Sequence, residues 1–399
     1  MMRNNIVIAH SLYTPNIIGG AEISTQILAE TMAKKYSVKV ITVGSQNERK
    51  VSKELVNEVE VLRLHHANLY WLGDTDRSKS TLDKIRWRFN DIYNIRQYKV
   101  IKNILSEASP KILHTQNLPG LSLSIWRAAK ELNIPIVHTL RDFSLLEPVP
   151  IKSYSHLYQK IARSLSRSVS KVIGISNDVL DKHLQRGYFP NAVPYIVPNV
   201  VEDKPENRDL YIKKEISHLN PLVIGYFGQL STVKGIEYLI QAVQGLPSSI
   251  VGKLLIFGEG PEREHLEELS NEDKRIQFMG KLDRAGVSRE MSRVDLTVVP
   301  SIWDEPFGRV IIESYQVGTN VLASNVGGIP EVLIEKDLNL FKPKESNSIS
   351  QAILGYYHLP LDHKVEMKCK CYEHSRKFST SSLFLEHENI YQDLIEISK

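Results

Sequence analysis

The chain has 399 residues, of which 42% are hydrophobic and 24% are charged. This composition excludes a disordered or fibrous protein, and the length predicts about two or three globular domains. No apolar run reaches the length of a membrane span, and the N-terminus lacks the long apolar core of a signal peptide, so we expect a cytoplasmic protein. The two cysteines, Cys369 and Cys371, are too few for a disulfide framework or a closed zinc site.

The charge is unevenly distributed along the chain. Residues 1–200 carry 27 Lys and Arg against 16 Asp and Glu, a balance of +11, whereas residues 201–399 carry 23 against 30, a balance of −7. A basic first half indicates an anionic partner for that half. One candidate is an anionic membrane, because the predicted helix 83–105 mixes basic and aromatic residues. The alternative is a helix packed on a sheet with a solvated basic face, and we recognise no nucleic-acid-binding module.

Predicted strands and helices alternate along both halves. Strand-like apolar runs cover residues 5–12, 38–43, 59–64, 111–116, 135–140, 171–176, 195–200, 222–227, 253–257, 276–279, 295–299 and 320–324. Helical periodicity covers 21–33, 83–105, 121–132, 236–246 and about 375–397. This alternation predicts an α/β protein with doubly wound parallel sheets, and the polar stretch 202–220 is typical of an interdomain linker.

Polar residues at the carboxyl ends of the first-half strands are candidates for ligand binding. His114 and Asn117 stand at the end of one predicted strand, and Arg141 and Asp142 follow the next. Side chains at this end of parallel strands line the crevice of such sheets. The first strand is followed by a loop with Gly19-Gly20 and a helix, but a G-x-G-x-x-G fingerprint is absent, and an ordinary turn is the alternative interpretation.

The most informative stretch is 300–314 in the second half. A buried strand leads through Glu305-Pro306-Phe307-Gly308 into a predicted helix that contains Glu313, with Pro306 expected in its first turn. A helix start favours a phosphate, whereas carboxylates accept hydrogen bonds from sugar hydroxyls, so the pattern suits a ligand with both groups. Lys234, in a loop after strand 222–227, suits a diphosphate as a point charge. The alternative is a helix-capping Glu, a solvated Glu and a surface Lys.

Glu305-Pro306-Phe307-Gly308, with Glu313 eight residues after Glu305, resembles the signature of the retaining glycosyltransferases of family four. The resemblance implies the GT-B fold, in which two Rossmann-like doubly wound domains face each other across a cleft and the C-terminal helix crosses back to the first domain. It implies an N-terminal acceptor domain of residues 1–201 plus about 378–399. Residues 202–377 would then form the donor domain.

The resemblance also implies the donor and its ligands. The donor is a nucleotide diphosphate sugar, with no other cofactor and no metal; Glu305 contacts the sugar hydroxyls, Glu313 the ribose and Lys234 the diphosphate. Further implied donor-binding residues are Gly20, Gly228, Gln229, Gly258, Gly280, Lys281, Phe307, Gly308 and Arg309.

A second set of residues is predicted for catalysis and for the acceptor. The candidate catalytic residues are Glu305 and Lys234 with Asp142 and Arg141, and the candidate acceptor-binding residues are His114, Asn117 and Arg141, which stand at the carboxyl ends of predicted parallel strands. The expected acceptor is a saccharide or a lipid-linked saccharide of cell-surface polysaccharide biosynthesis. The basic first half and the predicted basic helix suggest peripheral contact with the inner face of an anionic membrane. The implied reaction is a front-side attack in which the leaving phosphate takes the proton of the acceptor.

Two positions depart from the family's commoner pattern. Gln229 stands where Arg is usual, and Arg141-Asp142 stands where many members carry His-Asp. Because Arg is always protonated, Arg141 cannot shuttle a proton, but it could pair with Asp142 or hold an acceptor phosphate.

Other functions stay open at this point. One is a GT-B enzyme that epimerises or hydrolyses a nucleotide sugar or glycosylates a small molecule, and another is a nucleotide- or NAD-binding protein without catalytic activity. The missing dinucleotide fingerprint argues against NAD, and the combination of Glu305, Glu313 and Lys234 exceeds what nucleotide binding alone requires.

Overall fold

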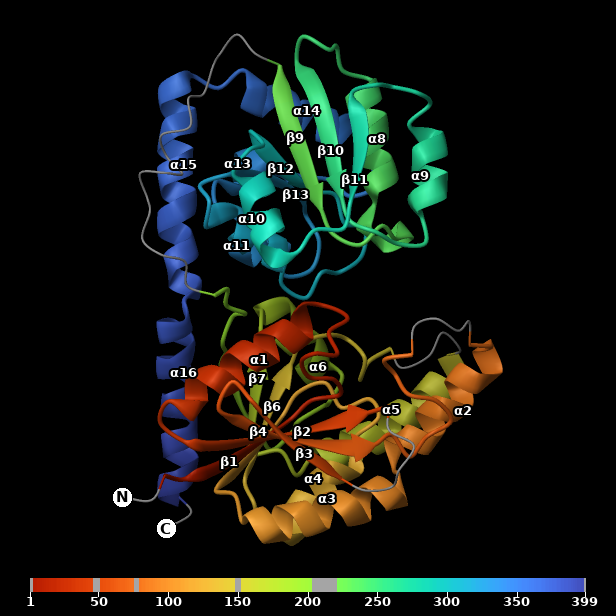
Figure 1. Ribbon diagram of the computed structural model, residues 1–399, viewed down its shortest axis with the longest axis vertical. Coiled ribbons are helices and arrows are strands. Elements are labelled where there is room, and N and C mark those ends of the chain that lie inside the picture. Colours follow the sequence, from red (N-terminus) through yellow and green to blue (C-terminus); the bar gives the residue numbers. More distant parts are fainter. Residues whose placement is uncertain (1–2, 46–50, 75–78, 148–151, 203–220, 398–399) are drawn as a thin grey trace. The chain divides into compact units, whose positions relative to one another are not determined.

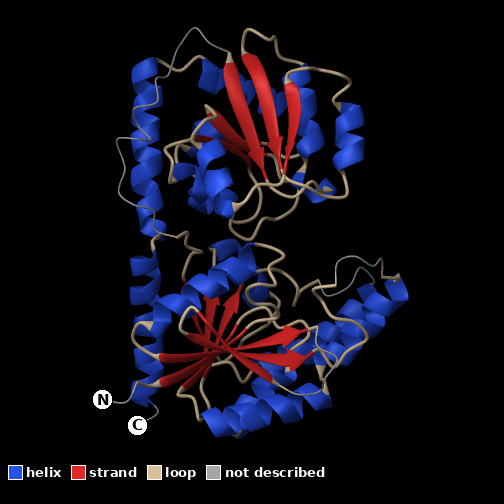
Figure 2. Cartoon of the chain, viewed as in Figure 1, coloured by secondary structure: helices blue, strands red, loops and turns tan. Residues whose placement is uncertain are grey.

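The computed structural model describes residues 3–45, 51–74, 79–147, 152–202 and 221–397. The chain divides into two compact units, Met1–Val200 with Thr380–Lys399, and Val201–Ser379. In each unit a central sheet is covered by helices on both faces (Figure 2). The predicted linker 202–220 lies outside the described residues, apart from Glu202.

The first unit contains an eight-stranded sheet in the order β3-β4-β2-β1-β5-β6-β7-β8. Its strands are β1 (Asn5–Ala9), β2 (Ser37–Gly44), β3 (Ser52–Val56), β4 (Val59–His65), β5 (Ile112–Thr115), β6 (Ile136–Leu140), β7 (Lys171–Gly174) and β8 (Val193–Ile196). Its helices are α1 (Gly20–Ala33), α2 (Thr81–Ile92), α3 (Ile95–Ala108), α4 (Ser124–Glu131), α5 (Lys152–Ser166), α6 (Asn177–Gln185) and α16 (Thr380–Ile397). The strand order reverses at β1, which has β2 on one side and β5 on the other, and both pairings are parallel.

The last helix, α16, completes the core of the first unit. It packs against α1 (Figure 1), and its Ile390 and Tyr391 share a buried cluster with Ile6 and Ile8 of β1. The Tyr391 hydroxyl also lies 2.6 Å from Nδ1 of His114 on β5. The C-terminal helix therefore belongs to the same unit as the first strand, as the GT-B fold predicted.

Two predicted features of the first unit are wrong. The predicted helix 83–105 is two helices, α2 and α3, because Tyr93 leaves the helical conformation and the side chain of Asn94 caps α3 by accepting from the backbone N–H groups of Arg96 and Gln97. β3, which pairs antiparallel with β4 at the edge of the sheet, was not predicted.

The second unit contains a six-stranded sheet in the order β11-β10-β9-β12-β13-β14, and all its strand pairs are parallel. Its strands are β9 (Leu222–Phe227), β10 (Val251–Phe257), β11 (Ile276–Gly280), β12 (Leu296–Val299), β13 (Asn320–Ser324) and β14 (Leu340–Phe341). Its α-helices are α8 (Ile236–Gln244), α9 (Arg263–Leu269), α10 (Arg284–Met291), α11 (Arg309–Tyr315), α12 (Ile329–Val332), α13 (Lys336–Asn339), α14 (Ser346–Tyr357) and α15 (Leu361–Ser375). Here the order reverses at β9, so the central pair is β9 and β12.

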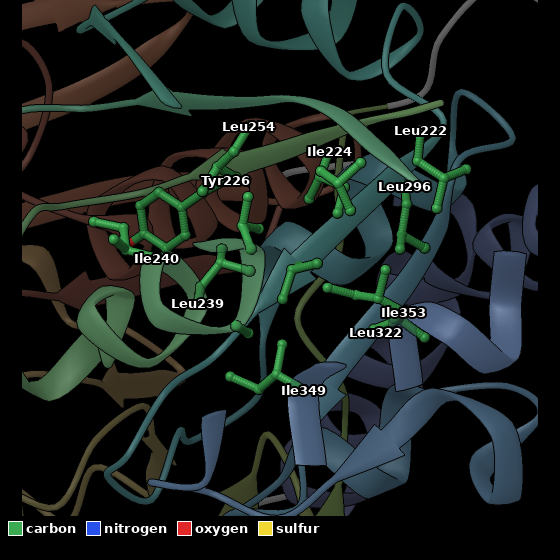
Figure 3. Close-up of a cluster of buried hydrophobic side chains, with 14 of the residues drawn as sticks. Leu222, Ile224, Tyr226, Leu239, Ile240, Leu254, Leu296, Leu322, Ile349 and Ile353 are labelled. Atoms are coloured by element: carbon green, nitrogen blue, oxygen red, sulfur yellow. The ribbon is translucent and has the colours of Figure 1, made fainter. Parts of the chain in front are cut away.

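Apolar side chains from these strands and from α8 and α14 form the core that holds this sheet rigid (Figure 3). Ile224, Leu254 and Leu296 come from three neighbouring strands, and Ile240 and Ile353 come from the covering helices. All five are completely buried, and burying each side chain stabilises the fold by about 1.5–3 kcal/mol. The loops at the carboxyl edge of the sheet are therefore attached to a well-packed core.

None of the helices in the described ranges combines the length and apolar character that a membrane crossing needs.

Candidate active site

Loops from the carboxyl ends of β9, β10, β12 and β13 lie against one another in the second unit. The backbone N–H of Leu230 donates to the carbonyl of Glu259 over 3.0 Å, and that of Ile302 donates to the carbonyl of Val233 over 2.9 Å. Because the strand order reverses at β9, this edge is the place where a doubly wound sheet binds its ligand.

Glycine makes the close approach of these loops feasible at two positions. Gly258 has φ +149°, and a Cβ there would lie 1.8 Å from the carbonyl oxygen of Gly228. Gly327 has φ +53°, and a Cβ there would lie 2.4 Å from the carbonyl oxygen of Glu305. A side chain at either position would clash with the neighbouring backbone. Only glycine therefore lets the loops approach this closely, beside Glu305 and beside Gly228.

Glu305 is the centre of a dense set of hydrogen bonds. Its Oε1 accepts from the Ser301 hydroxyl at 2.7 Å, from the Trp303 indole N–H at 3.1 Å, and from the ammonium of Lys234. The Lys234 ammonium also lies 5.6 Å from the centroid of the Trp303 ring. Within the described part of the chain, Oε2 of Glu305 has no hydrogen-bond partner, so one oxygen is held in place and the other is available to a ligand.

The helix that follows Glu305 begins later than the sequence indicated. α11 starts at Arg309, because Gly308 adopts a left-handed conformation with φ +88° and interrupts the helix, so the prediction that Pro306 occupies its first turn is wrong. The Arg309 side chain donates to Oε1 of Glu313 over 2.7 Å, one helical turn further on. Phe307 is buried, with its ring 5.8 Å from that of Phe378, so its side chain packs in the core.

The remaining predicted donor-binding residues of this unit lie around the same edge. Gly280 ends β11, and its carbonyl accepts from the N–H of Gly258 at 2.9 Å. Gln229 and Lys281 are exposed, and the carbonyl of Gln229 accepts from the Tyr226 hydroxyl at 2.8 Å. The structure thus brings Lys234 to Glu305, Arg309 to Glu313, and Gly258 to both Gly228 and Gly280.

Gly20 and the predicted acceptor residues belong to the first unit. Gly20 is the exposed first residue of α1, next to Gly19, whose backbone N–H donates to the Glu22 side chain over 2.8 Å. Arg141 donates through Nε to the side-chain oxygen of Gln116 and through Nη1 to that of Asn199.

Asn117, Asp142 and His114 also lie at the carboxyl edge of the first sheet. Oδ1 of Asp142 accepts the backbone N–H of Ser144 at 2.8 Å. His114 is fully buried, and its ring nitrogens lie 2.6 Å from the Tyr391 hydroxyl and 2.7 Å from the Thr139 hydroxyl. Burial, assisted by the nearby His387 and Arg141, holds the pKa of His114 well below its usual value. A direct contact between His114 and an acceptor would require one of its hydrogen bonds to break.

A cavity of about 20 Å³ at this edge contains residues that the sequence analysis did not select. Asp91 on α2, Tyr158 on α5 and Gln116 line it together with Asn117 and Arg141. Burial raises the pKa of Asp91 to about 7. One signal was available in the sequence, because Asp91 follows the buried Trp87 by one helical turn and therefore lies on the apolar face of α2.

No group of three His, Cys, Asp or Glu side chains within the described residues could hold a metal ion.

Two doubly wound units, each with a sheet covered by helices, form the architecture of the GT-B fold. Residues 207–378 match the family model described as Glycosyl transferases group 1, and residues 18–204 match that of Glycosyltransferase Family 4. The chain belongs to this family of glycosyltransferases.

Relatives and solved structures agree with this assignment. A Klebsiella pneumoniae protein described as an uncharacterized 42.6 kDa protein in cps region is 33% identical over 341 residues, 82% of this chain and 87% of that protein. The phosphatidyl-myo-inositol mannosyltransferase of Mycolicibacterium smegmatis is 25% identical over 272 residues, 65% of each chain. Sucrose-phosphate synthase from Thermosynechococcus elongatus superposes with a TM-score of 0.73 at 19% identity, covering 99% of this chain and 100% of that one. Anabaena Alr3699/HepE in complex with UDP and glucose gives 0.68 at 20% identity, covering 98% and 100%.

Proposed function

We propose that the protein transfers a sugar, with retention of configuration, from a nucleotide diphosphate sugar on the second unit to a saccharide or lipid-linked saccharide on the first. The observation that carries this proposal is the environment of Glu305. Its Oε1 is held by Ser301, Trp303 and Lys234, while Oε2 has no partner among the described residues. A carboxylate fixed in this way beside an ammonium suits a ligand that carries sugar hydroxyls and phosphates together.

The donor replaces the ion pair between Lys234 and Glu305. The ammonium of Lys234 turns to the diphosphate, and Oε2 of Glu305 accepts a hydrogen bond from a sugar hydroxyl. Glu305 keeps its hydrogen bonds to Ser301 and Trp303 during this exchange, so the carboxylate stays in position. Glu313 accepts from the ribose hydroxyls. The complexes of Alr3699/HepE with UDP and with UDP-glucose, which share the fold, support a nucleotide sugar as the donor class.

The chemical step breaks the bond between the anomeric carbon and the phosphate oxygen. The acceptor oxygen attacks from the same face, and its proton passes to the leaving phosphate, so the configuration is retained. Lys234 and the N–H groups of the turn at Phe307-Gly308-Arg309 stabilise the negative charge that grows on the diphosphate. Arg141 stays protonated throughout and takes no proton from the acceptor.

The acceptor belongs to cell-surface polysaccharide biosynthesis in this proposal. The Klebsiella relative from a cps region and the mannosyltransferase acting on phosphatidyl-myo-inositol support a saccharide or glycolipid product. On α2 and α5, which are in contact with each other, Leu82 and Leu157 are 65% and 51% exposed. Together with the basic first half, these side chains favour peripheral contact with an anionic membrane at the cytoplasmic face. Failure of the protein to float with anionic liposomes at low salt would remove this part of the proposal.

The reaction itself is tested with a panel of UDP-, GDP- and ADP-sugars, followed by NMR of the anomeric signals. A retaining transferase that slowly hydrolyses its donor releases a sugar whose first-formed anomer has the configuration of the donor. Inversion would contradict retention. An epimerase would instead change the sugar on the intact nucleotide, and a binding protein would leave every donor unchanged.

A further inference from the structure

The cavity at the carboxyl edge of β5 and β6 combines a hydrogen-bond donor and an acceptor that the fold itself does not use. Gln116 is only 1% exposed, and its Nε2 has no hydrogen-bond partner among the described residues. Its Oε1 accepts from the Thr25 hydroxyl at 2.8 Å and from Arg141. These two donors fix the orientation of the amide, since a flip would turn its N–H groups toward them.

Asp91 supplies the acceptor. It is 5% exposed, and its Oδ1 accepts the backbone N–H of Gly120 at 2.9 Å. Oδ2 takes part in no hydrogen bond with the described residues, although Asp91 lines the cavity. The buried amide N–H of Gln116 is unfavourable when left unpaired, unless a ligand or water completes it, and Oδ2 of Asp91 can accept from the same group.

We infer that this cavity is a subsite for one hydroxyl group of the acceptor saccharide, which donates to Asp91 and accepts from Gln116. The inference rests on the proposed function, because that function makes the first unit the acceptor-binding unit. A hydroxyl group is the smallest group that donates and accepts through a single atom. The volume of about 20 Å³ accommodates a group of that size, since a single water molecule needs roughly 10–15 Å³.

The same observations argue against a phosphate in this cavity. The carboxylate of Asp142 lines it, as does that of Asp91 once the pH is above its pKa of about 7, and both would then repel an anion. Arg141, the one cation among the described residues that line the cavity, donates to the neutral oxygens of Gln116 and Asn199. Its place in the hydrogen-bond network therefore orients the Gln116 amide, and Arg141 acts here as a positioning residue.

The test observes the side-chain amide of Gln116 directly. In protein labelled with ¹⁵N in glutamine side chains, the Gln116 signals are assigned from their loss in Gln116→Glu. Methyl glycosides of glucose, galactose and mannose, and separately inorganic phosphate, are then titrated into the wild-type protein. We expect at least one glycoside to shift the Gln116 signals in a saturable manner and phosphate to leave them unchanged. A response to phosphate alone would overturn the inference, and a failure of every glycoside to shift them would mean that the cavity holds only water.

A matched pair of variants distinguishes the loss of this subsite from a general effect of a substitution on the fold. Asp91→Asn keeps the shape of the side chain and its bond to Gly120. At about pH 8, where Asp91 is ionised, the substitution replaces a charged acceptor, so the affinity for the responding glycoside should fall by about tenfold or more. Asp181→Asn, at an exposed carboxylate of α6, should leave that affinity unchanged. Equal affinity in wild type and Asp91→Asn would contradict the inference.

Nucleotide binding to the same samples tests the proposed function independently. If a nucleoside diphosphate binds and no glycoside reaches Gln116, the subsite is wrong while the transferase stands. If no nucleotide binds, the transferase proposal fails whatever the glycosides do.

Discussion

Lys234 and Glu305 form an ion pair although they lie 71 residues apart in the sequence. They meet because their loops follow β9 and β12, which are neighbours at the centre of the second sheet. The Glu305 side chain is mostly buried, so an unpaired charge there would be unfavourable. In the proposed mechanism the ion pair compensates both charges until the phosphates and hydroxyls of the donor replace it.

Replacing Lys234 by alanine should weaken the binding of the nucleoside diphosphate. A charge-assisted hydrogen bond contributes about 1.5–3 kcal/mol, so the dissociation constant should rise roughly tenfold to a hundredfold. Titration calorimetry measures this change, and Lys274→Ala, at an exposed position of the same unit, is the control. An unchanged affinity in Lys234→Ala would exclude Lys234 from diphosphate binding.

Replacing Glu305 by alanine should abolish transfer and leave the affinity for the nucleoside diphosphate nearly intact, because Glu305 is assigned to the sugar. Trp303→Phe removes one donor to Oε1 but keeps a ring beneath Lys234, so it should raise KM for the nucleotide sugar several-fold with little effect on nucleotide binding. Steady-state kinetics beside calorimetry separates the two quantities. An equal loss of nucleotide affinity in Glu305→Ala would refute this division of roles.

Gly327→Ala should destabilise the second unit. The new Cβ would lie 2.4 Å from the carbonyl oxygen of Glu305, in a backbone with φ +53° that costs a side-chain-bearing residue about 1–2 kcal/mol even without the clash. The melting temperature of this unit should therefore fall by several degrees. Gly245→Ala is the matched control, because its φ is −74° and the nearest atoms to an added Cβ are 3.6 Å away. Equal melting temperatures for the two variants would disprove the steric argument.

Acid should destabilise the first unit before the second. Desolvation lowers the pKa of several buried histidines, to about 3 for His10 and His138 and to about 4 for His183 and His387. Histidines of the unfolded chain titrate near 6.5, so below this pH the unfolded state binds more protons and the free energy of unfolding decreases as pH falls. Among the described histidines of the second unit, only His374 has a resolved downward shift in pKa.

Asp91 opposes this trend with a smaller effect. Its pKa is raised from 3.8 to about 7, so the folded state binds more protons over that interval and is favoured as pH falls through it. Burial also raises the pKa of Glu22, but five buried histidines, including His114, outweigh these two carboxyl groups. Hydrogen exchange measured from about pH 7 down to about pH 5 should show protection lost first in β5 and β6 and later in β9 and β10. Simultaneous loss in both sheets, or earlier loss in the second, would contradict the assignment.

The sequence predicted what depends on local pattern. Buried strands such as β9 and β13 appear as apolar runs, and their predicted bounds agree with the structure. β3 escaped detection because four of its five residues are exposed and it is an edge strand with charged side chains. The break between α2 and α3 depends on tertiary contacts of Asn94, whose backbone N–H donates to the Ser122 hydroxyl at 2.9 Å.

The residues of the candidate sites divide in the same way, into those that a local sequence pattern predicts and those that only the fold brings together. Glu305, Gly308 and Glu313 are close in sequence, so one motif indicated them together. The approach of Lys234 to Glu305 could be expected only through the family resemblance, since strand order decides which loops meet. Asp91 and Gln116 line one cavity from α2 and from the end of β5, and no local sequence pattern predicts that they lie together.

The most direct test of the central claim is a thermal-shift screen with UDP, GDP, ADP, CMP and NAD. A ligand present at about 100 times its dissociation constant stabilises the protein by ~2.7 kcal/mol, which is readily measured. The account predicts that one nucleoside diphosphate raises the melting temperature, that NAD does not, and that Lys234→Ala loses most of the shift. Stabilisation by NAD alone, or by none of these compounds, would contradict the assignment of Lys234, Glu305 and Glu313 to a donor site.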